Sequence, residues 1–288
     1  MSSLQFLQLK CATQRKLNSI DSIGYKKSFF PSPNFALSLF MIQQYDRLLT
    51  TYAYNILGSY EDAKDVVQDA YLNFMQRDNK TIEDTKAYLV RSVINISINK
   101  KNKQKRERSS YPGEWLPEPI ATEKADSAVN RKEILSYSLM VLMEQLNAKQ
   151  RAVFILKEAF AYDHSEIAAV LDITEEHSRK LLSRAKEQLK TVDVFAIPKA
   201  NTTYVDKYLA AIQNANMPQL EKMLHDEVVV VSDGGGKVTA FRKPVIGRAP
   251  VIKLLLGVFK KFYAKNIELK KTTINHEPAL CIMKTESL

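Results

Sequence analysis

Residues 146–190 place the strongest constraint on the fold, because their apolar side chains follow two short helical periods separated by a turn. Thr174 stands at the start of the second period, where its hydroxyl can cap a helix. Glu175 and Glu176 follow in the first turn, where the helix dipole favours acidic side chains. Asp172 occupies the turn itself, where glycine is more usual. The pattern predicts a helix-turn-helix.

The solvent-facing side of the second helix is basic and polar. Such side chains can donate hydrogen bonds to phosphates and to base edges in the major groove of DNA. A plain pair of solvated helices can be equally basic, and from this segment alone that alternative stays open. The candidate DNA-contacting residues are Glu176, His177, Arg179, Lys180, Ser183, Arg184 and Lys186.

The net charge of the chain is +10, which suits a partner with a phosphate backbone better than an acidic small molecule. A merely basic protein is the alternative. The two cysteines, Cys11 and Cys281, lie near opposite ends and have neither CxxC nor Cys/His spacing, so we expect no disulfide framework, metal or cofactor. A reducing, cytoplasmic location is expected, and no apolar run is long enough to cross a bilayer.

The first 40 residues have no hydrophobic period and no signal-peptide pattern, and we interpret residues 1–40 as a poorly ordered arm. A regular pattern begins at Met41. A second hypothesis is therefore that translation starts at or near Met41.

Residues 45–76 predict two helices divided by Gly58 and Ser59. The second helix presents an acidic face in an otherwise basic protein. This face is unsuited to DNA; it is either a solubilising surface or a docking surface for a basic protein partner. Its candidate residues are Asp62, Asp65 and Asp69.

A third helix is predicted to begin near Thr85 and to lead into a basic cluster of Lys101, Lys103, Lys105, Arg106 and Arg108. The cluster extends a helix that already carries polar side chains, as phosphate tracking along DNA would need, although such runs are often only solvated tails. The polar residues off the apolar side are Arg91, Asn95, Asn99 and Lys100.

Residues 109–127 read as a linker, because Pro112, Pro117 and Pro119 forbid a helix. Trp115, the only tryptophan in the chain, and Leu116 are costly to leave in water. We therefore expect both side chains to contact a neighbouring domain.

Residues 41–190 resemble the extracytoplasmic-function sigma factors of bacterial RNA polymerase. Sigma region 2 is similar to LGSYEDAKDVVQDAYLNF, and its promoter-melting part is similar to AYLVRSVINISINKKNK. Region 4 is similar to LNAKQRAVFILKEAF with its helix-turn-helix. The resemblance implies core RNA polymerase and promoter DNA as partners. It implies core binding by Asp62, Asp65 and Asp69, minus-ten contacts by Arg91, Asn95, Asn99 and Lys100, and minus-thirty-five contacts by the second helix of the helix-turn-helix.

WLPEP at residues 115–119 and DGGGK at residues 233–237 resemble the paired signatures of a sigma subgroup with a SnoaL-like C-terminal extension. The resemblance implies that this extension replaces a separate anti-sigma protein and regulates from within the chain. Asp233 and Lys237 then become candidates for contact with the sigma core near Trp115. By spacing alone, the three glycines indicate only a flexible hairpin turn.

The predicted fold is mainly α, with two helical sigma domains and a C-terminal α+β cone of the SnoaL or NTF2 type. The cone ends at Leu288, before further strands and an Asn-Pro-Asp-Lys-Leu motif known in relatives, so we expect it to be truncated. The expected domains are an arm at 1–40, region 2 at 41–108, a linker at 109–130, region 4 at 131–192 and the SnoaL-like domain at 199–288.

Two other functions compete with that of a non-enzymatic sigma factor. SnoaL-like cones also house isomerases and cyclases, for which His225, Asp226 and His276 are the available acid–base groups, but their spacing specifies no chemistry. A helix-turn-helix regulator that acts without polymerase would not need the acidic helix. Charge reversal at Asp62 and Asp65 would leave such a regulator intact.

Overall fold

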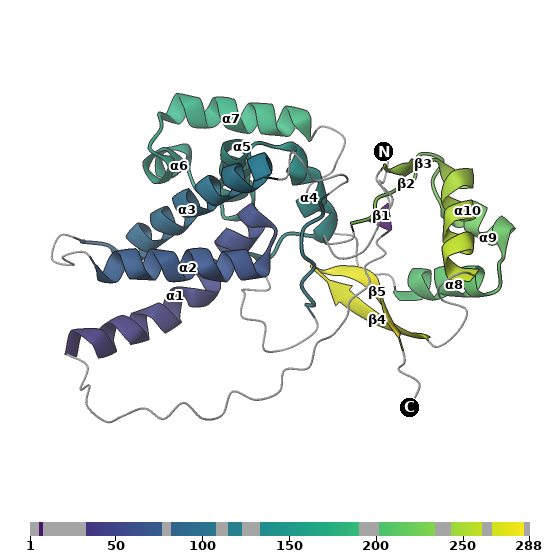
Figure 1. Cartoon of the computed structure of the whole chain (residues 1–288). Helices are drawn as coiled ribbons and strands as arrows, with labels where there is room; N and C mark the ends of the chain where they lie inside the picture. The colour runs from purple at the N-terminus through teal and green to yellow at the C-terminus, as the bar shows by residue number, and fades with distance from the viewer. Residues whose placement is uncertain are drawn as a thin grey trace, which may run out of the picture.

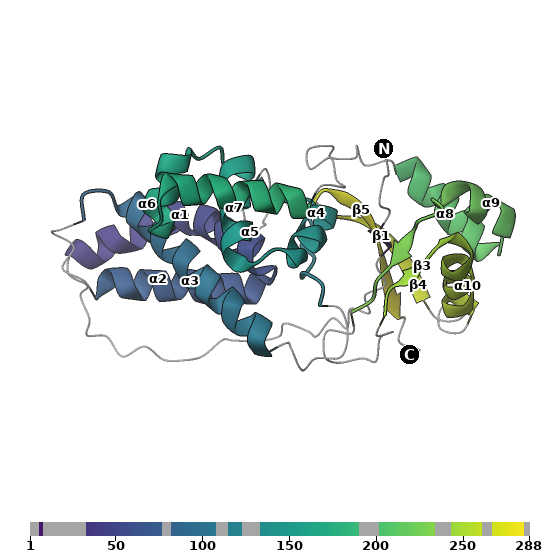
Figure 2. The same cartoon turned by 90° about the horizontal axis from the view of Figure 1, so that it is seen from above.

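The molecule consists of a helical body and a smaller C-terminal domain, and a β-hairpin lies between them (Figures 1 and 2). Within the parts described, no helix combines the length and hydropathy that a membrane span requires. The computed structural model describes residues 6–7, 33–76, 82–107, 115–122, 133–189, 202–233, 243–260 and 267–284.

The helical body begins with α1 (Pro33–Leu57), α2 (Tyr60–Met75) and α3 (Thr85–Glu107). The α1 helix therefore starts within the segment that we expected to be a poorly ordered arm. The α3 helix runs through most of the basic cluster that was expected to follow it. At the α1–α2 turn Gly58 has a φ of +77°, which favours glycine over residues with a Cβ. The hydroxyl of Ser59 caps α2 by accepting from the Asp62 amide at 3.4 Å.

The second half of the body contains the predicted helix-turn-helix, α6 (His164–Leu171) and α7 (Glu175–Gln188). Thr174 caps α7 as expected, because its hydroxyl accepts from the His177 amide at 3.1 Å. Asp172 has a φ of +53°, the left-handed conformation in which glycine is the usual residue. The preceding elements are α4 (Tyr137–Leu142), the 3-10 turn η4 (Met143–Gln145), α5 (Ala148–Phe154) and the π turn η5 (Ile155–Ala159).

One apolar core runs through both halves of the body. Leu49, Val93, Met140, Phe154 and Leu181 all belong to it, and each is largely or fully buried. The α3 helix packs against both α5 and α6. The two predicted sigma domains therefore share a hydrophobic interior in this structure.

The C-terminal domain has its own core and contains both helices and strands, as expected of an α+β domain. The glycine-rich turn at 234–242 lies outside the described residues. Phe6–Leu7, within the expected arm, forms β1 and pairs in parallel with β2. The other elements are α8 (Thr202–Gln213), α9 (Met217–Met223), β2 (Val229–Val230), β3 (Val245–Ile246), α10 (Arg248–Val258), β4 (Ile267–Ile274) and β5 (Glu277–Lys284).

The β4–β5 hairpin is an antiparallel pair whose tip, Asn275 and His276, has left-handed backbone at both residues. Asparagine tolerates this conformation better than most residues. In both views the hairpin extends from the side of the C-terminal domain toward α4 (Figures 1 and 2).

Candidate nucleic-acid and protein interfaces

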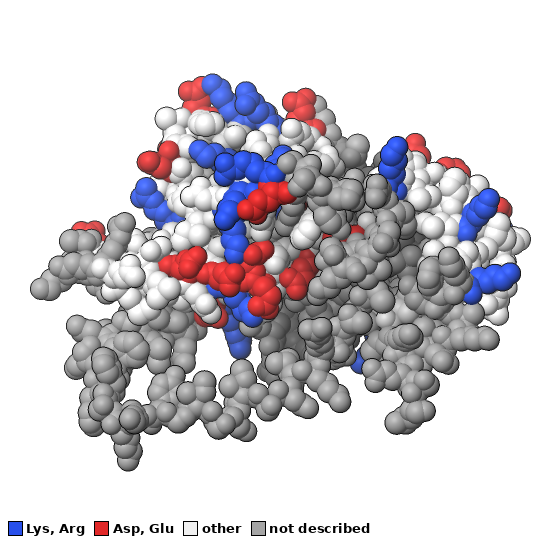
Figure 3. Space-filling view, in the orientation of Figure 1, with Lys and Arg blue, Asp and Glu red and all other residues white. Residues whose placement is uncertain are grey.

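The acidic face of α2 is on the surface, where acidic side chains gather over the helix and basic side chains lie above them (Figure 3). Asp65 and Asp69 are exposed, whereas the Asp62 side chain is 28% exposed. Lys100 on α3 lies 2.8 Å from a carboxylate oxygen of Asp62 and 3.2 Å from one of Asp65. Gln104 also donates to Asp62 at 2.7 Å. The α3 helix thus partly neutralises this face, and Asp69 forms no ion pair within the described part of the chain.

The exposed face of α2 continues into apolar residues that our sequence reasoning did not single out. Leu72 is 52% exposed and Met75 is 41% exposed. Both follow Asp65 and Asp69 at helical spacing, which was the available signal. An acidic stripe that ends in exposed apolar side chains has the mixed character of a protein-binding surface.

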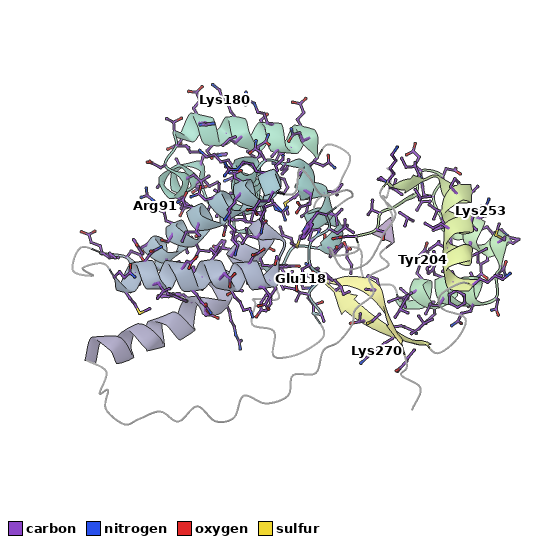
Figure 4. The ribbon with its side chains drawn as sticks, in the orientation of Figure 1. Arg91, Glu118, Lys180, Tyr204, Lys253 and Lys270 are labelled. Carbon is purple, nitrogen blue, oxygen red and sulfur yellow. The ribbon has the colours of Figure 1, made fainter. Side chains whose placement is uncertain are left out.

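The polar candidates on α3 have different surroundings. Arg91 and Asn99 are exposed, and Figure 4 shows Arg91 at the outer side of the body. The Asn95 amide donates to the Val170 carbonyl on α6 at 2.9 Å and to the Arg91 carbonyl at 2.9 Å. Asn95 therefore faces the other half of the body, and Lys100 is paired with α2 as described above.

Lys101 does not belong to an exposed basic cluster, contrary to the sequence-based interpretation. Its side chain is 10% exposed and lies 2.8 Å from a carboxylate oxygen of Glu144. Its ammonium also donates to the Leu57 carbonyl at 3.1 Å. The burial of α3 against η4 and α1 removes this lysine from any surface that tracks phosphates.

The candidates on α7 are all exposed, and Lys180 lies on the outer side of the helix (Figure 4). Three of the cations are paired with carboxylates: Arg179 with Glu175 at 2.8 Å, Lys180 with Glu176 at 2.6 Å, and Lys186 with Glu158 at 2.6 Å. The pairs of Arg179 and Lys180 are exposed on both sides, so they are weak and can exchange for phosphate. Arg184 forms no ion pair with a residue that the structure describes.

The linker contacts the C-terminal domain at Leu116. The backbone amide of Leu116 donates to a carboxylate oxygen of Asp233 at 3.1 Å, and both residues are buried. Trp115 is 36% exposed at this boundary. Lys237, the other expected contact, lies outside the described residues.

The linker also binds the α1–α2 turn. The Glu118 amide donates to the Gly58 carbonyl at 2.6 Å, and the Glu118 carboxylate accepts from the Tyr60 amide at 2.9 Å. Figure 4 shows Glu118 between the helical body and the hairpin. From the other half of the body, the Tyr137 hydroxyl donates to the Pro117 carbonyl at 2.8 Å. The linker is therefore fixed by both halves at once.

The hairpin tip completes this junction through Asn275, which is fully buried. Its side-chain oxygen accepts from the Ile120 amide at 2.9 Å, and its side-chain nitrogen donates to the Leu135 carbonyl at 3.1 Å. The same nitrogen lies 2.9 Å from the Tyr54 hydroxyl on α1. One residue of the C-terminal domain thus contacts α1, the linker and the segment before α4. A turn-forming asparagine was the only sign of this contact in the sequence.

Two further contacts secure the hairpin. The Thr122 amide donates to the Thr273 carbonyl at 2.9 Å, which extends the hairpin by one bridge to the linker. The Glu277 carboxylate accepts from the amide and hydroxyl of Ser138 in α4. Burial raises the pKa of Glu277 above its ordinary value, although the bonds from Ser138 act in the opposite direction.

The acid–base groups of the enzymatic alternative have separate surroundings. Asp226 is paired with Arg248 at 2.5 Å, and the His225 ring nitrogen accepts from the Glu227 amide at 3.3 Å. His276 lies at the hairpin tip, where its amide donates to Thr122. These three described groups form no hydrogen bond with one another.

Comparisons with known proteins match each half of the helical body to a sigma-70 region. Residues 41–107 match the family Sigma-70 region 2, and residues 136–189 match Sigma-70, region 4. The chain is 30% identical to the ECF RNA polymerase sigma factor SigJ of Mycobacterium tuberculosis H37Rv over 221 residues, which are 74% of this chain and 70% of that protein. It is 22% identical to the probable ECF RNA polymerase sigma factor SigI of Mycobacterium tuberculosis CDC 1551, over 79% of this chain and 88% of that protein.

The fold is similar to the crystal structure of the Mycobacterium tuberculosis extracytoplasmic function sigma factor SigJ. The TM-score is 0.69 at 28% identity, and the match covers 84% of this chain and 83% of the other. The likeness therefore extends beyond the two helical halves into the C-terminal domain. The chain belongs to the extracytoplasmic-function sigma factors of RNA polymerase.

Proposed function

We propose that this sigma factor binds core RNA polymerase through the exposed face of α2 and directs it to promoters with α3 and α7. The observation that carries the proposal is the presence, on one small body, of an acidic helix face and a separate exposed basic helix. The acidic face suits a basic protein surface, and the basic helix suits DNA. A chain that only bound DNA would have no need of the acidic face.

The core-binding surface consists of Asp62, Asp65 and Asp69, with Leu72 and Met75 at its end. Charged residues steer a partner and set its register, while exposed apolar side chains supply area that becomes buried on binding. Asp69 is the cleanest probe of this surface, because Asp62 and Asp65 also hold Lys100.

The upstream promoter element is read by α7. Arg184 and Ser183 are exposed near the middle of the helix, and His177 is exposed in its first turns. The paired cations Arg179 and Lys180 exchange their glutamates for phosphates or base edges when DNA binds. Lys186 and Glu176 complete this surface.

The downstream element is bound by α3, and this requires the two sigma regions to separate. Elements centred about 25 base pairs apart are about 85 Å apart along B-form DNA, whereas Asn95 of region 2 is hydrogen bonded to Val170 of region 4 at 2.9 Å. The structure is therefore a closed arrangement. Separation frees Asn95 to join Arg91, Asn99 and Lys100 on the promoter.

The C-terminal domain regulates this separation from within the same chain, in place of a separate anti-sigma protein. Its hairpin and Asp233 contact the linker, α1 and α4 together. A domain that touches both sigma regions at their junction stabilises the arrangement in which they are close. Trp115 and Leu116 lie within this junction, and Lys237 is assigned to it from the family motif alone.

The test is promoter-specific transcription by purified core RNA polymerase with the full chain, using fragmented genomic DNA as template. Asp69→Lys should lower specific transcripts on the order of 10-fold through loss of core binding. Glu221→Lys, an equal charge change on an exposed helical residue of the C-terminal domain, is the matched control. If both variants transcribe like the parent chain, the assignment of α2 is wrong. DNA binding without any polymerase recruitment would favour a stand-alone regulator.

A further inference from the structure

Three charged side chains meet in the interior between region 2 and region 4. Arg151 of α5 is fully buried, and its guanidinium lies 2.6 Å from a carboxylate oxygen of Glu144. Lys101 of α3 lies 2.8 Å from the same oxygen and 2.9 Å from the other. The Glu144 side chain is 24% exposed, and that of Lys101 is 10% exposed. We call Lys101, Glu144 and Arg151 the charge triad.

The triad also binds the end of α1. The Arg151 guanidinium donates to the Asn55 carbonyl at 3.0 Å, and the Lys101 ammonium donates to the Leu57 carbonyl at 3.1 Å. The last carbonyls of a helix have no partner within the helix and carry its negative dipole end. A cation from region 4 therefore satisfies a helix terminus of region 2.

Glu144 is the central member, because its carboxylate contacts both cations. Burial by itself raises the pKa of Glu144, but the neighbouring charges of Arg151 and Lys101 outweigh burial and hold that pKa below its ordinary value. Glu144 is thus ionised in the closed arrangement. Without its charge, the two cations would lose the carboxylate that they share in a poorly hydrated site.

We propose that the charge triad is a latch that holds regions 2 and 4 together, and that the separation required for promoter binding proceeds by hydration of these three side chains. The charged side chains of a buried ion cluster are hydrated again when they separate, and this hydration offsets part of the lost attraction. Apolar side chains at the same positions would regain nothing, so they would make the closed arrangement harder to open. The inference rests on the proposed function for its biological meaning, but not for its test.

The test measures the distance between the two regions in the full-length chain. Cysteines at the exposed positions Gln68 on α2 and Gln188 on α7 carry a donor and an acceptor dye, after replacement of Cys11 and Cys281 by serine. Single-molecule energy transfer then gives the ratio of closed to separated molecules. Circular dichroism confirms that each variant remains helical.

Glu144→Gln should shift the ratio toward separated molecules by on the order of 100-fold, because it removes the carboxylate charge that Lys101 and Arg151 share. The combined variant Lys101→Met, Glu144→Leu and Arg151→Met should shift the ratio the other way and require more denaturant for separation. Glu158→Gln is the matched control, since Glu158 is 16% exposed and pairs with Lys186 within region 4. It should leave the ratio unchanged.

An unaltered ratio in Glu144→Gln would overturn the latch. A larger fraction of separated molecules in the combined variant would also overturn the latch. That result would mean that the closed arrangement needs the three charges and is not stabilised by apolar side chains in their place. If Glu144→Gln fails to remain helical, the combined variant still tests the proposal by the direction in which it shifts the ratio of closed to separated molecules. Transcription with core polymerase is measured separately. If neither the parent chain nor the separated Glu144→Gln variant supports promoter-specific transcription, the proposed function is refuted and the distance result still stands.

Discussion

Replacement of Asn275 by alanine is expected to undock the β4–β5 hairpin from the helical body. The substitution removes the partner of the Ile120 amide and of the Leu135 carbonyl. The Tyr54 hydroxyl keeps an acceptor, the Glu118 carbonyl at 2.6 Å. An unsatisfied buried group costs about 1–3 kcal/mol. Ile120 and Leu135 are only partly buried, so the lower part of that range applies to each. The two groups cost about 1–1.5 kcal/mol each, and together about 2–3 kcal/mol.

The backbone adds a second, smaller cost. Asn275 has a φ of +46°, a conformation that asparagine tolerates more readily than alanine. Backbone strain in Asn275→Ala therefore adds about 1 kcal/mol to the loss. His276 has a φ of +67°, and its side chain forms no hydrogen bond with any residue that the structure describes. His276→Ala therefore carries the same strain without the lost contacts. We expect about 3–4 kcal/mol for Asn275→Ala and about 1 kcal/mol for His276→Ala.

Hydrogen exchange measures the undocking directly. Among the described residues, the Thr122 amide donates to the Thr273 carbonyl at 2.9 Å, and this bond protects it while the hairpin is docked. A loss of about 3 kcal/mol corresponds to roughly 100-fold faster exchange at that amide. Protection of Thr122 within about 3-fold of the parent chain, less than 1 kcal/mol, would refute the reasoning. An equal loss in His276→Ala would attribute the effect to strain instead of hydrogen bonds.

Three other outcomes are expected. Arg184→Ala should weaken promoter binding by about 1–3 kcal/mol in fluorescence anisotropy titrations; an equal loss on random DNA would argue against base reading. Burial raises the pKa of Glu277 in the folded chain above its ordinary value of 4.5. The folded protein therefore gains stability from this group when the pH is below 4.5, and it loses that stability as the pH rises through the raised pKa. Glu277→Gln should remove this dependence in thermal melts from about pH 4 to about pH 8. Gly58→Ala should cost about 1–2 kcal/mol in urea titrations, because φ is +77° and the new Cβ would lie 3.3 Å from the Pro117 side chain; an unchanged midpoint would contradict this.

Helical periodicity and capping residues were sufficient to predict most of the helical body. The α7 helix begins after the threonine that was expected to cap it, and α3 begins at Thr85 as expected. The exposed face of α7 was also predictable, because side chains three and four residues apart share a face. The start of α1 at Pro33 was not predictable, since residues 33–40 show no clear apolar period. The burial of Lys101 was missed because the residues directly before and after it are polar or basic, although it follows Ile94 and Ile98 at helical spacing.

The sequence by itself determined the local elements and the family, since caps, periods and motifs depend on residues within a few turns of one another. Only the tertiary structure decided which partners the charged and polar side chains take. Lys101 meets Glu144, and Asn275 reaches Tyr54, across long stretches of chain. The physical reason is that desolvation and Coulomb attraction depend on burial and on distances of a few ångströms, which packing alone sets. The closed arrangement of the two sigma regions arises at that level.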